Sequence, residues 1–127
     1  MQKENRLSTH WRTSKSWNLS DLIFHCEKIV TLYDDKKAYN SCLHLCFLLA
    51  SELINDPILI LTFQYSNHKS HAVLKTHDYI IDLSVGMILN SKKAIIHKFS
   101  FFDEKRYKRY YNEKVETVSA IHISREI

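Results

Sequence analysis

The spacing of apolar residues predicts two helices in the first half of the chain. In residues 16–35 the apolar positions recur every three or four residues, which is typical of an amphipathic helix, and Asn18 or Ser20 can cap its start. The segment CLHLCFLLASELIND (residues 42–56) is apolar on almost every side, so it predicts a helix that is buried on most of its faces. Pro57 follows directly and cannot continue that helix.

The second half of the chain predicts an antiparallel sheet. Short β-prone runs are separated by polar turns, which is the pattern of consecutive strands. The expected strands are ILILTFQY (58–65), SHAVLKT (70–76), YIIDLSV (79–85), AIIHKFSF (94–101) and VETVSAIHI (115–123). The segment FDEKRYKRYYNEK (102–114) is either a helix or an extended basic loop. The predicted fold class is therefore α+β, with the cysteine-bearing helix packed on the sheet, in a single domain over residues 1–127 whose first 15 residues are loosely structured.

Composition narrows the class of protein. The apolar fraction of 45% and the charged fraction of 25% are those of an ordinary globular domain. The net charge of +4 permits acidic partners without requiring them. The opening MQKENRLSTH lacks the apolar core of a signal peptide, and the runs LCFLLA and PILILTF are too short to span a membrane. We therefore expect a cytoplasmic protein with no membrane partner and no disulfide among its three cysteines.

One cysteine has the position of a nucleophile. Cys42 falls at the first or second position of the second predicted helix. The free N–H groups and the dipole of a helix N-terminus favour the thiolate, which is the reactive form. A cysteine can also be a small apolar core residue, and this simpler interpretation fits Cys26 and Cys46 well.

A histidine and an aspartate lie eleven residues apart in the predicted hairpin. A two-residue loop of His77 and Asp78 would place Val73 opposite Asp82, and a four-residue loop gives the same register. His71 and Asp82 are then diagonal neighbours on one face, about 7–8 Å apart at the backbone. An odd-numbered loop would put the two on opposite faces. In the even register the carboxylate can fix the tautomer of the imidazole and stabilise its protonated form.

The order of these three residues and the elements that carry them resemble the minimal core of the transglutaminase-like branch of the papain-like cysteine hydrolases. In that superfamily the nucleophilic cysteine begins a central helix, the histidine starts a strand in patterns such as H-A-W-V, and the aspartate closes the next strand in patterns such as Y-I-D-L-T. The corresponding segments of this sequence are HAVL and YIIDLS. The resemblance covers residues 38–86 and implies that Cys42 is the nucleophile, His71 its base and Asp82 the residue that orients the base.

The resemblance implies a thiol peptidase or amidase that acts through a thioester intermediate and needs no cofactor or metal. Peptide cleavage is the expected reaction, with amide deamidation or acyl transfer as alternatives. The leader peptidases of lasso-peptide maturation are similar in size and in the short interval from cysteine to histidine. They cut a ribosomal precursor peptide with the help of a separate peptide-binding protein. The expected partner is thus a peptide or protein substrate, delivered by such a protein if this subfamily applies.

Stabilising the oxyanion of such a reaction needs the Cys42 backbone N–H and one further donor. The indole of Trp17 and the side-chain amide of Gln64 are both candidates.

A zinc site is the first competing interpretation. Cys42, His44 and Cys46 form C-x-H-x-C, but on a helix each residue turns by about 100°, so His44 points away from Cys42. The adjacent pair His25 and Cys26 could add ligands, yet the chain has no C-x-x-C pair.

Two further interpretations use other features of the chain. KRYKRYYNEK (residues 105–114) interleaves basic residues with tyrosines, as binders of single-stranded nucleic acid do. We favour a solvated helix face there that is backed by its tyrosines, or in a hydrolase a contact for an acidic peptide. A catalytically silent interaction or immunity-type protein could also keep this fold, with Cys42 and His71 serving only as packing residues.

Overall fold

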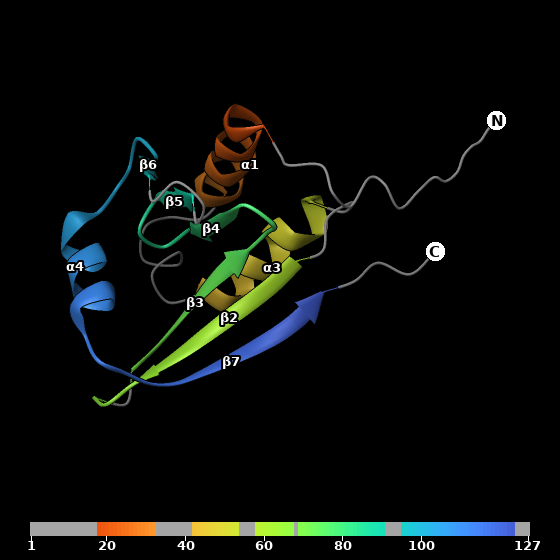
Figure 1. The fold of residues 1–127 in the computed structure, drawn as a ribbon. Coiled ribbons are helices and arrows are strands. Elements are labelled where there is room, and N and C mark those ends of the chain that lie inside the picture. Colours follow the sequence, from red (N-terminus) through yellow and green to blue (C-terminus); the bar gives the residue numbers. More distant parts are fainter. Residues whose placement is uncertain (1–17, 33–41, 54–57, 68, 91–94, 124–127) are drawn as a thin grey trace.

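The computed structural model describes residues 18–32, 42–53, 58–67, 69–90 and 95–123. These residues form an α+β fold, as predicted, with three helices and one six-stranded antiparallel sheet. The strand order in the sheet is β6-β5-β4-β3-β2-β7 (Figure 1). The elements are α1 (Leu19–Thr31), α3 (Cys42–Glu52), β2 (Ile58–Tyr65), β3 (Ser70–Lys75), β4 (Tyr79–Asp82), β5 (Met87–Asn90), β6 (Ile95–Lys98), α4 (Glu104–Asn112) and β7 (Val115–Ile123). No helix in the described ranges is long and apolar enough to cross a membrane.

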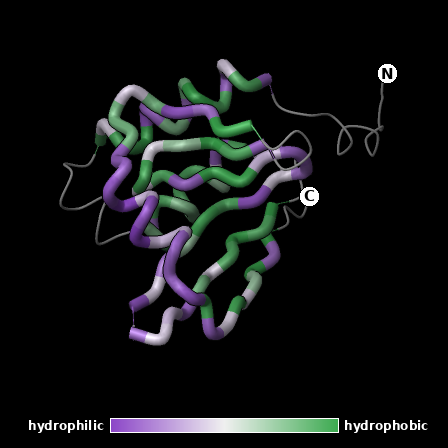
Figure 2. Tube along the Cα trace, turned by 60° about the vertical axis from the view of Figure 1, so that its left-hand side comes forward, coloured by the Kyte–Doolittle hydropathy of each residue, from purple (hydrophilic) through white to green (hydrophobic). Residues whose placement is uncertain are grey.

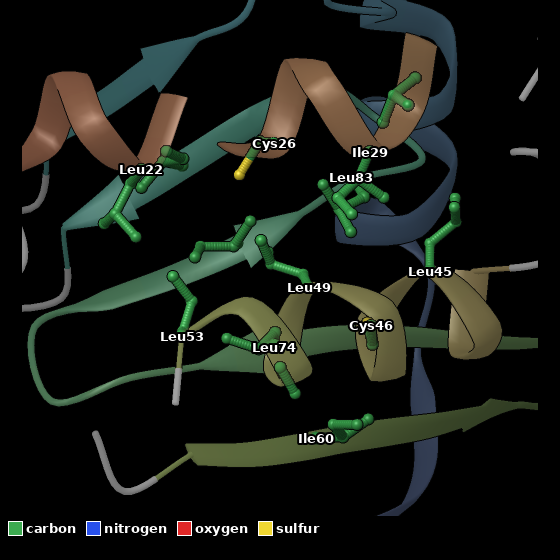
Figure 3. Packing of buried hydrophobic residues seen from close by; sticks show 14 of the residues in the cluster. Leu22, Cys26, Ile29, Leu45, Cys46, Leu49, Leu53, Ile60, Leu74 and Leu83 are labelled. Carbon is green, nitrogen blue, oxygen red and sulfur yellow. The ribbon is translucent and has the colours of Figure 1, made fainter. Parts of the chain in front are cut away.

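Helix α1 begins where the sequence predicts. The Asn18 side chain accepts hydrogen bonds from the backbone N–H groups of Ser20 at 2.9 Å and Asp21 at 3.4 Å, which satisfies two of the free donors of the first turn. Leu22 and Cys26 point from α1 toward the core (Figure 3). This helix therefore packs beside α3, and its buried residues join the same apolar cluster as α3 and the strands.

Helix α3 starts at Cys42 and packs on β2 and β3. Its residues Leu45, Cys46 and Leu49 are fully buried between the sheet and α1 (Figure 3). The prediction that this helix is buried on most faces is wrong on one side, because Leu43 and Phe47 remain 39% and 41% exposed. The sheet and α1 cover only two sides of the cylinder, and the third side still reaches solvent.

The β3–β4 hairpin has the predicted register. Lys75 lies opposite Ile80, and the Thr76 N–H donates to the Tyr79 carbonyl at 2.9 Å. The turn between these strands therefore has the even length that puts His71 and Asp82 on one face. The strand at residues 94–101 is shorter than predicted and forms β6, whereas β5 was not predicted.

The two faces of the sheet carry two separate apolar clusters. One lies beneath α1 and α3 and includes Ala72 and Leu74 of β3. The other lies beside α4 and consists of Tyr65, Val85, Met87 and Tyr110, with Phe63, Phe102 and Tyr107 packed against them. Figure 2 shows hydrophobic and hydrophilic colouring alternating along the backbone. Because side chains alternate along a strand, His71 points to the α4 side, next to its cross-strand partner Phe63.

Gly86 closes the turn that follows Asp82, and its backbone is in the left-handed region with φ of 85°. A Cβ at this position would lie 2.7 Å from the Phe101 ring. We predict that Gly86→Ala lowers the free energy of unfolding by about 2 kcal/mol, through backbone strain and the clash together. Urea denaturation of the variant tests this. Ala50→Gly in α3 is the control, with an expected loss of about 1 kcal/mol from helix propensity; a Gly86→Ala loss no larger than the control's would contradict the proposed strain.

Candidate active site

The site is built around a buried pair of ionisable side chains. Nε2 of His71 lies 2.6 Å from Oδ2 of Asp82, and both side chains are completely shielded from solvent. His71 comes from the second residue of β3 and Asp82 from the last residue of β4. The hairpin register brings them together as diagonal neighbours, as the sequence predicts. The ring nitrogen that faces the carboxylate is therefore a donor, and Nδ1 is the nitrogen left for other chemistry.

The carboxylate of Asp82 is held by donors on both oxygens. Oδ1 accepts from the Ser84 hydroxyl at 3.1 Å and from the Val85 backbone N–H at 3.1 Å. Oδ2 accepts from the Tyr111 hydroxyl at 3.0 Å in addition to His71. The turn over residues 83–86 thus orients Asp82, and the direction of its Oδ2 fixes the orientation of the imidazole ring.

Cys42 acts on the same imidazole ring from the N-terminus of α3. Burial disfavours the charged ring, but the hydrogen bond and charge of Asp82, together with the nearby Cys42 sulfur, outweigh it and raise the pKa of His71 to about 9. His71 therefore carries a proton at neutral pH. The imidazole ring therefore interacts both with the Asp82 carboxylate and with the Cys42 sulfur.

Nδ1 of His71 is buried and has no partner in hydrogen-bonding geometry. Cys42 influences the pKa of the ring, so its sulfur is nearby, although it forms no hydrogen bond with Nδ1. In enzymes, catalytic hydrogen bonds are often poorly aligned without substrate and tighten when it binds. The structure thus brings together the three residues that the sequence singles out.

The other two cysteines have a different environment. Cys26 and Cys46 are fully buried in the core between the helices and the sheet. Burial raises the pKa of both thiols well above the ordinary value. Cys42, which is only partly buried, is therefore the cysteine that is placed to react with a molecule from solvent.

Two tyrosines of α4 complete the site, and the sequence did not indicate them. The Tyr110 ring stacks on the His71 ring with centroids 3.7 Å apart and planes 7° apart, and Tyr111 donates to Asp82. Both belong to the basic segment 105–114, for which a solvated helix face backed by tyrosines was favoured over a nucleic-acid contact. The segment 104–112 is a helix, in which Tyr110 is buried and Tyr111 is partly exposed. The spacing of these tyrosines suits any amphipathic helix, so nothing in the local sequence indicates that they contact His71 or Asp82.

Tyr65 lies at the edge of this site. Its ring is 6.0 Å from that of Tyr110, centroid to centroid. Burial, followed by the charge of Asp82, raises the pKa of Tyr65 to about 12, so its hydroxyl stays protonated.

The second oxyanion donor is not identified by the geometry. Gln64 is exposed and lies opposite Ser70 on the neighbouring strand, one residue from the cross-strand pair of Phe63 and His71. Trp17 lies outside the described residues.

A zinc site at Cys42, His44 and Cys46 does not form. His44 is on an exposed side of α3, whereas Cys46 is in the core. Across the described ranges, no three His, Cys, Asp or Glu side chains are grouped so that they could hold a metal ion.

Comparison with known proteins gives no match. The chain matches no protein-family model, no curated protein sequence and no solved structure.

Proposed function

We propose that this protein is a cysteine hydrolase with a papain/transglutaminase-like core, and that it cleaves a peptide or amide bond. Cys42 is the nucleophile, His71 the general acid and base, and Asp82 the residue that orients His71. The observation that carries the proposal is the shared imidazole. One of its nitrogens donates to a buried carboxylate at 2.6 Å, and a thiol at a helix N-terminus acts on the same ring.

The first half of the reaction is acylation. The Cys42 thiolate attacks the substrate carbonyl carbon, so an S–C bond forms and the carbonyl oxygen becomes an oxyanion. Nδ1–H of the His71 imidazolium then gives its proton to the leaving nitrogen as the C–N bond breaks. The products of this step are a free amine and a thioester on Cys42. The backbone N–H groups at the start of α3 are suited to stabilise the oxyanion.

The second half regenerates the thiolate. Neutral His71 takes a proton from water through Nδ1 while the water oxygen bonds to the thioester carbon. The C–S bond then breaks, a carboxylic acid leaves, and the imidazolium and thiolate are restored. If an amine takes the place of water, the same steps transfer the acyl group. Hydrolysis of a peptide bond is the reaction we favour. The lasso-type leader peptidase, with substrate delivered by a partner protein, is one form of it.

Identification of the products tests this proposal. The full chain is incubated with a library of peptides from a digested bacterial proteome, and the products are identified by mass spectrometry. New peptide termini indicate cleavage, a gain of about one mass unit at glutamine or asparagine indicates deamidation, and addition of a supplied amine indicates transfer. We expect new termini that are absent with Cys42→Ala. If no product in any of the three classes depends on Cys42, the enzyme proposal is overturned and the catalytically silent alternative stands.

A further inference from the structure

The helix α4 is attached to the turn that supports Asp82. The Asp103 N–H donates to the Val85 carbonyl at 2.8 Å, and the Arg106 guanidinium donates to the Ser84 carbonyl at 3.2 Å. Asp103 also caps the helix by accepting from the Arg106 backbone N–H at 3.1 Å. Ser84 and Val85 are the residues that donate to the Asp82 carboxylate. The start of α4 is thus fixed relative to Asp82, which determines where its last turn lies.

The last turn places one aromatic ring flat against the imidazole. Tyr110 is 7% exposed, and its ring is nearly parallel to that of His71 at 3.7 Å. A stacked ring opposes rotation of the imidazole out of its plane. Because it covers only the face of the imidazole, both nitrogens at the ring edge can still form hydrogen bonds. The face of an aromatic ring also attracts a cation, so this contact favours imidazolium over a neutral ring.

The next residue of α4 acts on the carboxylate. The Tyr111 hydroxyl donates to Oδ2 of Asp82 at 3.0 Å, and this is the oxygen that also accepts from His71. Burial and then the Asp82 charge raise the pKa of Tyr111, so the phenol keeps its proton and remains a donor. A second donor on one oxygen spreads the carboxylate charge and weakens its attraction for the imidazolium. The residue Tyr111 as a whole is 38% exposed, although its hydroxyl donates to the buried Asp82 carboxylate.

We propose that Tyr110 and Tyr111 are positioning residues of the site. Tyr110 holds the His71 ring in line with Cys42, and Tyr111 weakens the attraction of the Asp82 carboxylate for that ring. This inference rests on the proposed function of the three residues that the tyrosines contact. It gives the tyrosine-rich part of segment 105–114 a role within the site, in place of a contact for nucleic acid.

The test uses three variants of the full chain and two measurements that need no substrate. Nuclear magnetic resonance follows the titration of the His71 ring, and mass spectrometry follows the rate at which iodoacetamide alkylates Cys42 at pH 7. Tyr111→Phe removes one donor from Asp82, so the pKa of His71 rises by about 0.5–1 unit. Tyr110→Leu releases the ring, so alkylation of Cys42 slows by about tenfold, whereas Tyr110→Phe restores the rate to within about twofold because the stacking remains.

Tyr107→Phe is the matched control on the same helix. Its ring packs against those of Phe102 and Tyr111 with centroids 5.8 Å and 5.2 Å apart. Because the change removes only the hydroxyl and keeps both ring contacts, it should change neither measurement. The inference is overturned if Tyr111→Phe leaves the His71 titration where it is in the parent chain, or if Tyr110→Leu is alkylated at the parent rate. Thermal unfolding of each variant shows that it is folded. A different result would overturn the proposed function itself, namely that no product formed from peptides depends on Cys42.

Discussion

Replacing Cys42 with alanine should reduce turnover of the peptide substrate by about 10⁴-fold or more, because no other group in the site can form the thioester. The fold should remain, since Cys42 is only partly buried and the change removes a single sulfur atom at the start of α3. We expect the free energy of unfolding to change by less than about 1 kcal/mol. The measurement is the rate of product formation by the variant on a peptide that the parent chain cleaves, together with its thermal unfolding.

Cys46→Ala is the control for this prediction. Cys46 lies on the same helix one turn further along, fully buried, and has no place in the proposed reaction. Its replacement leaves a small cavity and should lower stability by about 1 kcal/mol while turnover persists. Equal turnover by Cys42→Ala and the parent chain would show that Cys42 is a packing residue.

Replacing Asp82 with asparagine should lower kcat by about 10³–10⁴-fold, because a neutral amide no longer stabilises the imidazolium or fixes its tautomer. The same change should alter the pH dependence. Burial of His71 opposes its protonation, and Asp82 is the first of the groups that raise its pKa to about 9. Without that carboxylate the pKa of His71 moves down. The imidazolium is the acid that protonates the leaving amine, so activity is lost as pH rises through this pKa.

The pH profile of kcat/KM therefore tests the role of Asp82. In the parent chain activity should fall above about pH 9, and in Asp82→Asn the residual activity should fall at a clearly lower pH. Asp103→Asn is a suitable control, since Asp103 caps α4 and pairs with Arg106 but does not contact His71. If kcat/KM falls at the same alkaline pH in Asp82→Asn as in the parent chain, His71 is not the group whose titration limits activity.

The parts of the site that could be predicted from the sequence are those set by local geometry. The apolar spacing and Asn18 placed the start of α1, and the start of α3 at Cys42 followed from its apolar run. The pairing of His71 with Asp82 followed from the even length of one turn, because a register shift of one residue would move Asp82 to the other face.

The remaining features depend on contacts between distant residues. β5 has only four residues, too few for a periodic pattern to stand out. β7 pairs with β2 across the 49 residues 66–114, and nothing local in either strand specifies that partner. The stacking of Tyr110 on His71 joins residues 39 positions apart, and it depends on the attachment of α4 to the turn after Asp82. The position of α4 over the site is therefore a product of tertiary packing.

The central claim is that the Cys42 sulfur and the His71 imidazole work as a pair, and the most direct measurement is site-resolved alkylation. Iodoacetamide is added at pH 6–8 to the folded parent chain and to His71→Gln, and mass spectrometry gives the rate at each cysteine. The account predicts that Cys42 reacts well before the buried Cys26 and Cys46 in the parent chain, and that its rate at pH 6 falls at least about tenfold in folded His71→Gln. Equal slow labelling of all three cysteines, or a Cys42 rate that does not depend on His71, would contradict it.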